Sequence, residues 1–584
     1  MTRSPRLALA AALALLLLLT APAAAQWPSD PGANLAIADR TSEQVIPKIA
    51  SAPDNGTYVG WFDLAAGSYD VYLQRLNAAG VEQWPHNGIL VSDHPQNTSL
   101  VDWDLIADSA GNCVLVFADI RGAGDLDVQA YKIAPDGTFL WGANGITLSV
   151  STDYEPAPRV TEASDGDLVF VWPRWPDGGG GKIMMQRLAP DGTLRYPAPL
   201  PIAGDPNEQP AFAAIVAADA GSVIVSWVRD VTTFMSSRHV RARKFAPDGS
   251  PLWPAHVNVF DAVSVPIAYT PKLEPDGTGG ALVLWHRSQS NLYNSLLQHL
   301  SASGAELFPH NGVEVATTAM YHIDPALAYR RATGECFIFW NERNSNQSQW
   351  GIYAQKITAA GARAWGNAGL ELQPVNTIYK SYPRCVQIGD GAAVFYYEEP
   401  TGQFNRDRLL AIRIDTNGAL VWPTTPLVVS SYLSSKARIP LTIDAAGVTK
   451  IVWEDDRNGT PDVYGQNVNP DGTLGPSQTG IGGPGPAAPG ALNILPNQPN
   501  PFRGLTELGI AAGAALGGHA AFVIADVTGR IVRTIEVPGW ASDGARIAWD
   551  GRDDRGAPLP SGTYFYRLVT PTGESAPARA TLVR

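Results

Sequence analysis

The chain has few cysteines, and beyond residue 25 it has no long apolar segment. Its three cysteines, Cys113, Cys336 and Cys385, are too few and too widely spaced for a disulfide framework. Cys113 and Cys336 take equivalent positions in apolar stretches, which indicates small buried hydrophobic side chains. A helix needs roughly 20 apolar residues to cross a bilayer, so we expect no transmembrane segment.

Catalytic and metal-binding motifs are also missing. The sequence has no Gly-x-Ser-x-Gly, no His-Glu-x-x-His and no phosphate loop, and its nine histidines lack metal-ligand spacing. Nothing marks a carboxylate pair at the spacing that glycosidases use. Acidic loops such as 119–127 offer oxygen ligands for Ca²⁺ but lack the EF-hand spacing. We therefore expect no catalytic residue, metal or cofactor, with Ca²⁺ as the alternative.

Acidic residues outnumber basic residues. The chain has 42 Lys and Arg against 55 Asp and Glu, a net charge of −13, which becomes −15 without Arg3 and Arg6. Binding to nucleic-acid phosphates needs a basic surface. The balance therefore argues against a nucleic-acid partner and mainly favours solubility.

The first 25 residues have the pattern of a secretory signal peptide. Arg3 and Arg6 give a positive start, and the apolar run 7–19 is too short to span a bilayer. The alanines at 23–25 fit a small-residue cleavage site. We expect residues 1–25 to be removed on export, with an uncleaved anchor as the alternative. The protein is then secreted or held at the outer-membrane surface.

One pattern of about 56 residues occurs eight times. Its copies begin at Val71, Val128, Ile183, Val240, Ser295, Ile352, Leu409 and Val463. Each unit holds four short strand candidates between Gly, Asp and Pro turns. Such sheets bury both apolar faces only by packing on neighbours around an axis. The sequence predicts an all-β fold, with an eight-bladed β-propeller of four-stranded blades over residues 26–475. The repeat resembles uncharacterised bacterial β-propeller repeats.

Two aromatic positions recur in the repeat. The second strand ends on Trp61, Phe117, Trp172, Trp227, Trp285, Trp340, Tyr397 and Trp453. The fourth strand follows Trp27, Trp84, Trp141, Tyr196, Trp253, Phe308, Trp365 and Trp422. We expect these rings, the six fourth-strand tryptophans among them, to be structural and to fill the layers between blades.

The last unit lacks its fourth strand, because position 476 is Pro where an aromatic is expected. The segment 26–38 matches a fourth strand in type, since its Gln-Trp-Pro start repeats the one at 83–85. We expect residues 26–38 to complete the last blade, which leaves no open sheet edge at the seam.

The variable end of each blade is the expected binding face. The turns between strands 3 and 4 are uniform, whereas the loops between strands 2 and 3, such as 172–181 and 341–350, vary in length and chemistry. A rigid scaffold normally carries function on its varied end. Trp175, Trp350 and Phe404 on these loops are candidates for stacking on a ligand.

Charged residues also gather at this end. Lys48, Arg159, Lys272 and Arg384 each stand at the entry of an innermost strand. They form either a cationic mouth for an anionic ligand or solvated strand ends. Some loops begin with a carboxylate and an arginine, at 119–121, 342–343 and 455–457, which indicates ion pairs that organise the loop.

A separate module follows a Gly-, Pro- and Ala-rich linker at 476–491. Alternating strand patterns with Gly turns over residues 492–584 predict a small Ig-like β-sandwich. Its motifs are Pro-Asn-Pro-Phe at 499–502, Asp-Val-Thr-Gly-Arg at 526–530, Trp-Asp-Gly-Arg-Asp at 549–553 and Ser-Gly-Thr-Tyr-Phe-Tyr-Arg at 561–567.

These motifs resemble the FlgD-like Ig domain and the type A sorting domain of type IX secreted bacterial proteins. The resemblance implies a partner in the secretion machinery and delivery to the outer-membrane surface. Arg503-Gly504 departs from the family pattern, so the sequence leaves open whether this domain is a recognised sorting signal or a structural cap.

Three functions fit the sequence. The first is a non-catalytic binding or adhesion propeller with a protein or glycan ligand. The alternatives are an extracellular polysaccharide-acting enzyme with its site on the variable face, and a structural surface spacer.

Overall fold

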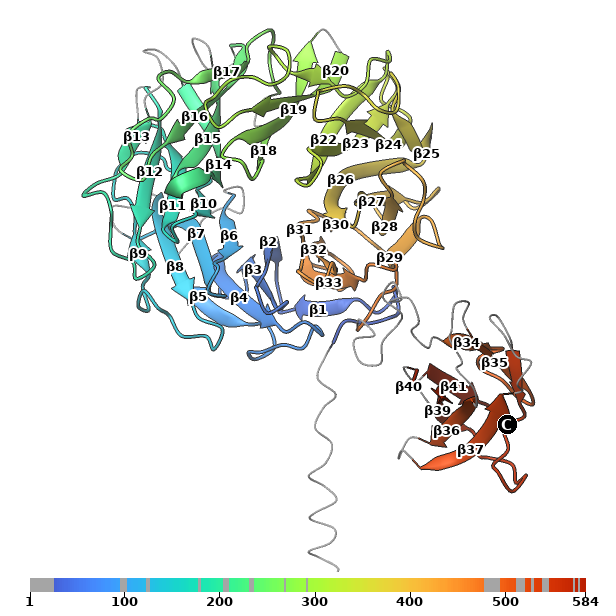
Figure 1. Cartoon of the computed structure of the whole chain (residues 1–584). Coiled ribbons are helices and arrows are strands. Elements are labelled where there is room, and N and C mark those ends of the chain that lie inside the picture. The colour runs from blue at the N-terminus through green and yellow to red at the C-terminus, as the bar shows by residue number, and fades with distance from the viewer. Residues whose placement is uncertain are drawn as a thin grey trace, which may run out of the picture. The chain divides into compact units, whose positions relative to one another are not determined.

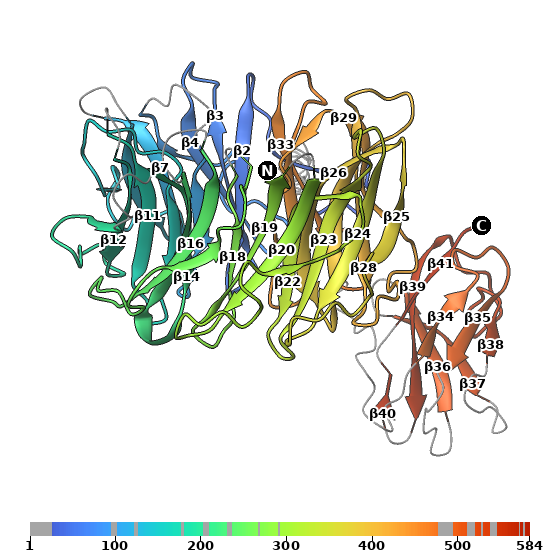
Figure 2. The same ribbon diagram turned by 90° about the horizontal axis from the view of Figure 1, so that it is seen from above.

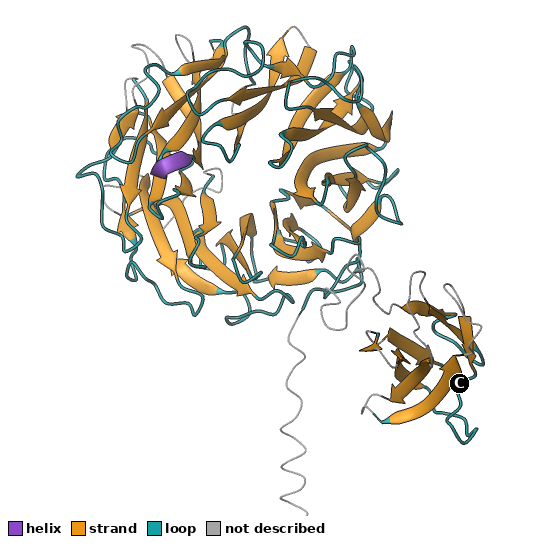
Figure 3. Ribbon diagram, viewed as in Figure 1, coloured by secondary structure: helices purple, strands orange, loops and turns teal. Residues whose placement is uncertain are grey.

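Seven four-stranded antiparallel sheets and one five-stranded sheet form a ring in this computed structural model, and a smaller β-sandwich follows (Figures 1 and 3). The structure describes residues 26–584 except 95–101, 122–125, 177–179, 203–208, 231–235, 267–268, 290–291, 477–493, 511–519, 527–529, 538–545, 571–572 and 576–577. The chain divides into two compact units, Met1–Pro476 and Ser477–Arg584. The predicted all-β fold, an eight-bladed propeller plus an Ig-like domain, is confirmed. The predicted signal peptide 1–25 lies outside the described residues.

The first four blades follow one another along the chain. Blade 1 contains β2 (Gln44–Ser51), β3 (Thr57–Asp63), β4 (Asp70–Leu76) and β5 (Ile89–Ser92). Blade 2 contains β6 (Asp104–Ala107), β7 (Cys113–Ile120), β8 (Leu126–Ile133) and β9 (Ile146–Thr147). Blade 3 contains β10 (Arg159–Glu162), β11 (Leu168–Arg174), β12 (Lys182–Leu188) and β13 (Leu200–Ile202). Blade 4 contains β14 (Gln209–Ala217), β15 (Val223–Asp230), β16 (Arg238–Phe245) and β17 (Val257–Phe260), with the short 3-10 helix η1 (Asp219–Gly221) between its first two strands.

The other four blades complete the ring. Blade 5 contains β18 (Lys272–Pro275), β19 (Ala281–Gln289), β20 (Leu292–Leu300) and β21 (Val313–Glu314). Blade 6 contains β22 (Tyr321–Arg330), β23 (Glu335–Arg343), β24 (Trp350–Ile357) and β25 (Leu370–Asn376). Blade 7 contains β26 (Tyr379–Ile388), β27 (Gly391–Glu399), β28 (Asp407–Ile414) and β29 (Leu427–Ser434). Blade 8 contains β30 (Lys436–Ala437), β31 (Leu441–Ile443), β32 (Thr449–Asp455), β33 (Asp462–Val468) and β1 (Leu35–Ala38).

The blades pack side by side around a central axis, with the first strand of each blade innermost (Figures 1 and 2). The second strands are the most buried; every residue of β3 and β32 is buried. They read as nearly continuous apolar runs because each sheet is covered on both faces by its neighbours. Each apolar layer accordingly joins successive blades, as where Val114 of blade 2 packs with Phe170 of blade 3.

A contact between an aromatic and a glycine recurs at all eight blade junctions. The fourth-strand aromatic of each blade lies against the glycine of the turn between strands 3 and 4 in the next blade. The pairs are Trp27–Gly80, Trp84–Gly137, Trp141–Gly192, Tyr196–Gly249, Trp253–Gly304, Phe308–Gly361, Trp365–Gly418 and Trp422–Gly472. These glycines adopt positive φ, and a Cβ atom on most of them would collide with the ring. The repeated Gly and the repeated aromatic therefore serve one contact.

The N-terminal segment closes the ring. β1 pairs antiparallel with β33, with Leu35 opposite Gly465. Before β1, the Nδ2 of Asn34 donates to Val429 O (3.1 Å), and the backbone N of Trp27 donates to Ala79 O (3.0 Å). The segment thus joins blades 7, 8 and 1.

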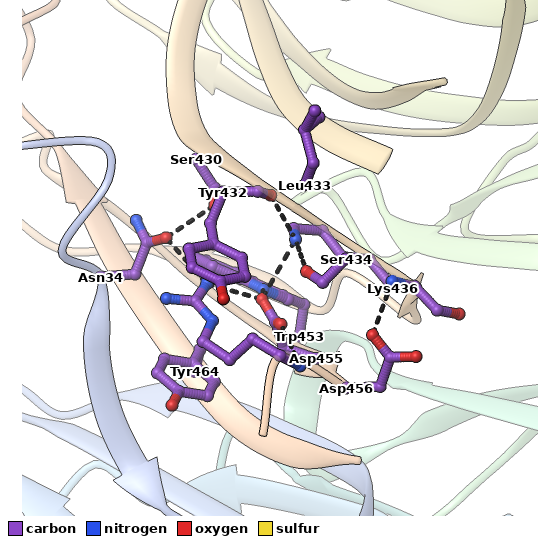
Figure 4. A network of polar contacts seen from close by, with 12 residues as sticks. Asn34, Ser430, Tyr432, Leu433, Ser434, Lys436, Trp453, Asp455, Asp456 and Tyr464 are labelled. Atoms are coloured by element: carbon purple, nitrogen blue, oxygen red, sulfur yellow. Dashed lines mark hydrogen bonds and ion pairs between the residues drawn. The ribbon is translucent and has the colours of Figure 1, made fainter. Parts of the chain in front are cut away.

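A buried network of charges lies at this seam (Figure 4). Lys436 Nζ is 3.1 Å from Asp455 Oδ2, and both side chains are 0% exposed. Arg457 also pairs with Asp455 (2.6 Å), and its guanidinium lies 4.4 Å from the ring centre of Tyr432 and 3.9 Å from that of Tyr464. Asn34 accepts a hydrogen bond from Arg457 at 3.1 Å, so the N-terminal segment takes part in the network.

The register of blade 7 corrects one prediction. The second-strand aromatic there is Tyr396, since it faces Leu410 as Trp340 faces Tyr353 in blade 6. The sequence pattern placed this position at Tyr397, one residue further on. Tyr397 instead lies on the opposite face of the strand.

The C-terminal unit is a two-sheet sandwich. One sheet contains β34 (Ile494–Gln498), β35 (Thr506–Ile510) and β38 (Arg546–Trp549). The other contains β36 (Ala520–Asp526), β37 (Ile531–Val537), β39 (Gly562–Thr570), β40 (Gly573–Glu574) and β41 (Ala578–Leu582). Its core explains the quoted motifs: Trp549 packs between Phe502 (ring centres 5.2 Å apart) and Tyr564 (5.6 Å). Within the described part of the chain, no helix is long and apolar enough to cross a membrane.

Candidate functional site

The innermost strands bend at the end of the channel that carries the varied loops. In six blades one residue near the strand entry has φ between 47° and 53°: Ile46, Ala157, Phe212, Asp324, Tyr382 and Arg438. The strand register shifts at this place in β2, β14, β22 and β26. Bulges of this kind re-aim side chains and are common beside functional sites.

The four predicted basic residues occupy one equivalent position in alternate blades. Lys48, Arg159, Lys272 and Arg384 belong to blades 1, 3, 5 and 7. Their cross-strand partners are Gly60, Val171, Leu284 and Phe395, each directly before the second-strand aromatic. The four cations therefore stand at one level of the channel, with approximate fourfold symmetry.

Three of the four cations have carboxylate partners. Asp102 joins Lys48 (2.7 Å) to Arg159 (2.6 Å), and Arg384 lies 3.3 Å from Asp324. Burial opposes ionisation of Asp102, but the two cations overcome it and hold the pKa of its carboxyl well below the usual range. These pairs fix the cations in place and leave the mouth positively charged.

Lys272 is the exception. Its ammonium makes no hydrogen bond or ion pair with any residue that the structure describes. Desolvation in the channel, with the positive charges of Arg384, Lys48 and Arg159, lowers the pKa of Lys272 to about 8. Asp324 opposes this shift. Lys272 therefore carries a positive charge at neutral pH that no described carboxylate pairs with.

The channel mouth holds a cavity of about 460 Å³. Lys48, Lys272 and Arg384 line it together with Asp102 and Arg438. This volume is within the range of small-ligand sites. The predicted cationic mouth is thus a cavity with converging basic side chains, and its use as a ligand site remains a prediction.

Aromatic residues of blades 5 and 7 lie near the cations of the mouth, and Tyr382 lines the cavity itself. Tyr269 and His286 have ring centres 4.4 Å apart, and His286 lies 6.3 Å from Tyr293. Tyr382 is 44% exposed and lies 6.0 Å from the guanidinium of Arg384. The mouth therefore combines cations with aromatic faces on one side.

Tyr269 and His286 are both uncharged at neutral pH. Desolvation, with an added effect of Arg343, lowers the pKa of His286 to about 4, so its imidazole is neutral at pH 7. Burial raises the pKa of Tyr269 well above 10, so its phenol keeps its proton. Neither His286 Nδ1 nor the Tyr269 hydroxyl has a hydrogen-bond partner among the described residues. Both atoms are shielded from solvent, so the structure shows a neutral imidazole beside a protonated phenol.

The three predicted stacking residues belong to three different blades: Trp175 and Phe404 lie on loops, whereas Trp350, which was expected on a loop, is the first residue of β24. Trp175 packs on Tyr154 (5.7 Å) and donates from Nε1 to Pro210 O (3.0 Å). Trp350 packs edge-on against Tyr379 at 5.1 Å. Phe404 is 90% exposed. No ring contact joins the three among the described residues, and stacking on a ligand remains a prediction for each.

The charged loop starts differ from one another. Arg121 pairs with Asp119 (2.8 Å) as Arg457 pairs with Asp455, so both loops are organised by the predicted ion pair. Arg343 instead donates to the Asn341 side chain. The predicted Ca²⁺ loop 119–127 lies partly outside the described residues, and the described residues contain no group of three His, Cys, Asp or Glu arranged to hold a metal ion.

Sequence reasoning missed the acidic and aromatic partners at the mouth. Asp324 and Tyr382 directly precede Pro325 and Pro383, as Ile46 precedes Pro47. The residue before this repeated Pro stands at the channel mouth, so the repeat carried a usable signal. Tyr269 and His286 follow no repeated pattern, and only the fold brings them together.

The C-terminal module is similar to a known domain family. The family model described as the FlgD Ig-like domain matches residues 513–574. This agrees with the predicted resemblance, while a type IX sorting function remains to be shown. A comparison with curated proteins gives no match.

Solved structures with similar folds include propeller proteins. A PL25 ulvan lyase, solved bound to -[GlcA(1-4)Rha3S]-, is similar at 12% identity with a TM-score of 0.43 over 76% of this chain and 98% of that one. PorZ, a type IX secretion surface component of Porphyromonas gingivalis, is similar at 12% identity with a TM-score of 0.30 over 93% of this chain and 82% of that one. An α-L-arabinanase of Penicillium chrysogenum is similar at 14% identity with a TM-score of 0.30 over 54% of this chain and 94% of that one. These values carry no argument about activity, ligand or partner.

Proposed function

We propose that this protein is an exported surface propeller that binds an anionic ligand at its channel mouth without catalysis. The observation that carries the proposal is the convergence of Lys48, Lys272 and Arg384 on one cavity, with Arg159 at the same level. Cations gathered in a confined, partly desolvated space attract an anion more strongly than cations on an open surface.

The proposal of export rests on both ends of the chain. We propose a signal peptide at 1–25, a propeller at 26–475, a linker at 476–491 and an Ig-like sorting domain at 492–584. The similarity of residues 513–574 to the FlgD Ig-like domain supports the last assignment. In this scheme the C-terminal domain engages the secretion machinery and the propeller faces the medium. Fractionation of cells that express the full chain, with and without residues 492–584, tests delivery to the outer surface.

A glycan array tests the binding function. We expect the wild-type chain to bind glycans that carry uronate or sulfate groups, and not neutral glycans with the same backbone. The Lys48→Met/Arg384→Met double variant should lose this signal. Equal binding of neutral and acidic glycans would contradict an anion site, and no binding to any glycan or protein ligand would favour the structural spacer.

A second function, a polysaccharide-acting enzyme, is favoured by the Tyr269–His286 pair. Beside the cations of the mouth, a neutral imidazole can take the proton next to a uronate carboxylate, and a phenol can protonate the leaving glycosidic oxygen. This elimination breaks the C–H bond next to the carboxylate and the C–O bond to the leaving sugar and forms one C=C bond; the imidazole gains the proton from carbon, and the proton of the phenol goes to the leaving oxygen. Ultraviolet absorbance of an unsaturated uronate product would reveal it. Product formation that is lost in His286→Ala and Tyr269→Phe would establish an enzyme; no product, with binding intact, would favour the binder.

A further inference from the structure

The cavity at the mouth continues down the channel. A second cavity of about 780 Å³ is lined by residues nearer the opposite end of the inner strands, including Arg331 and Gln387. The two cavities share four lining residues, Glu274, Leu327, Cys385 and Leu441. They are therefore parts of one lumen, which the eight blades enclose on all sides.

The wall of the lumen combines apolar and charged groups. Blades 6 and 8 contribute the apolar residues Ala326, Leu327, Ile439, Pro440 and Leu441. The charged residues Lys48, Asp102, Lys272, Glu274, Arg384 and Arg438 stand between and beside them. A ligand that fills this space needs apolar surface together with anionic and hydrogen-bonding groups.

A pyranose ring with an acidic substituent offers both kinds of group. Its C–H groups can pack on the apolar lining residues, and its hydroxyl groups can donate to the carboxylates of Asp102 and Glu274. Its carboxylate or sulfate can accept hydrogen bonds from the cations. Because the four basic residues stand at one level, they suit a single anionic group better than a row of charges along a chain.

Resting on the proposed function, we infer that the lumen holds the end unit of an acidic polysaccharide, with Lys272 as the residue that anchors its anionic group. A closed ring of blades admits a polymer only by its end. Lys272 is the cation at this level without a carboxylate partner among the described residues, so it is free to pair with the ligand.

Titration calorimetry with a short oligogalacturonate and the full chain tests the anchor. Lys272→Met should weaken binding about tenfold to a hundredfold, which is the usual effect of losing a hydrogen bond between charged groups. Lys182→Met is the matched control, because Lys182 is an exposed lysine at the outer part of blade 3. The Lys182→Met variant should bind the oligogalacturonate with the wild-type affinity. Wild-type affinity in Lys272→Met would overturn the inference.

The pH dependence gives a second readout. Binding that needs the charged ammonium weakens as pH rises through about 8, the pKa of Lys272 in the free protein. A complex that forms only with the protonated amine is then about tenfold weaker at pH 9 than at pH 7. The charges that face Lys272 are Arg384, Asp324, Lys48, Arg159 and Glu274. Lys48→Met should keep the pH dependence and Lys272→Met should abolish it; the reverse result would assign the dependence to Lys48.

The number of bound proteins tests entry by the chain end. Long linear polygalacturonate should bind at most two propellers per chain, and light scattering measures this stoichiometry. Many propellers on each chain would overturn end binding while leaving the proposed anion site intact. If no acidic glycan binds at all, the proposed function itself fails. Binding of peptides through a C-terminal carboxylate, without binding of oligogalacturonate, would overturn the choice of a glycan.

Discussion

Trp27 lies against the backbone of Gly80 and joins the last blade to the first. A Cβ atom on Gly80 would stand 2.7 Å from Cγ of Trp27, and the Trp27 side chain is 1% exposed. The other seven junctions use the same contact between an aromatic and a glycine. Here the aromatic comes from the N-terminal segment, so the ring is closed by residues at the two ends of the propeller sequence.

Replacing Trp27 by Ala should destabilise the propeller by about 3–5 kcal/mol, the usual range for a buried large aromatic. Chemical denaturation measures the change. Trp422→Ala is the matched variant, since Trp422 makes the same contact with Gly472, and a similar loss is expected. Deletion of 26–38 should cost more than Trp27→Ala, because it also removes β1. An unchanged melting temperature after this deletion would refute the closure.

Gly80→Ala should be more harmful than Gly67→Ala, although both glycines have positive φ, 84° and 92°. Both variants incur the left-handed backbone penalty of about 1–2 kcal/mol. At Gly80 the new Cβ also collides with the Trp27 ring, whereas at Gly67 it meets nothing within 4 Å. The difference in unfolding free energy isolates the collision. Equal losses in the two variants would mean that the Trp27 contact is loose.

Much of this architecture is readable from the sequence because each repeat encodes it separately. Aromatic and glycine positions recur eight times, and the missing aromatic at 476 has its counterpart at Trp27. The basic residues at the mouth could be named from their place after a repeated Pro. The misplaced aromatic at Tyr397 has a local cause, since two tyrosines stand next to each other at 396–397 and only the strand register distinguishes them.

The partners of these residues could not be read in the same way. Asp102 pairs with Lys48 of the preceding blade and Arg159 of the following one, and such pairs depend on how neighbouring sheets pack. Tyr269 and His286 meet through a connection and a strand of blade 5 that share no repeat pattern. Sequence periodicity predicts the scaffold, while the site arises from departures from that periodicity.

Lys436→Met should destabilise the seam by about 1.5–3 kcal/mol, the usual loss of a hydrogen bond to a charged group, because Asp455 keeps Arg457 as its partner. Denaturant unfolding measures this loss. A Lys436→Met/Asp455→Leu double variant should be less stable still, because it also leaves the buried guanidinium of Arg457 without its carboxylate partner. If the double variant is more stable than Lys436→Met, the desolvation of Asp455 costs more than its pairing with Arg457 contributes.

The same network predicts loss of stability in acid. Burial opposes ionisation of Asp455, but Arg457 and Lys436 lower the pKa of its carboxyl to about 2. An unfolded Asp has a pKa of about 3.9. The stabilisation is therefore present above about pH 4 and is lost as pH falls toward 2. Asp455→Asn should make the unfolding free energy depend less on pH over this interval. The same pH dependence in this variant as in the wild type would mean that Asp455 is not the group responsible.

Two histidines at opposite sides of the ring provide a matched pair. Partial burial opposes protonation of His86, but hydrogen bonds with Glu82 and Asp39 raise its pKa above the usual 6.5. The pKa of His310 is raised in the same way by Glu306 and Asp261. Each contact stabilises below the unfolded pKa and is lost as pH rises through the raised pKa.

An NMR titration of both imidazoles checks this prediction. Asp39→Asn should lower the pKa of His86 and leave that of His310 unchanged. Because Asp39 directly follows the closing strand β1, the His86 signal also reports on closure. Equal behaviour of the two histidines in this variant would contradict the pairing across the seam.

The central claim is an anion site at the channel mouth, and one titration tests it most directly. An acidic oligosaccharide is titrated calorimetrically into the wild-type chain, Arg384→Met and Arg406→Met. Arg406 is an exposed arginine on a loop of the same blade, so both variants remove one positive charge. We expect Arg384→Met to weaken binding at least tenfold and Arg406→Met to match the wild type. Equal affinity of all three proteins would contradict the site.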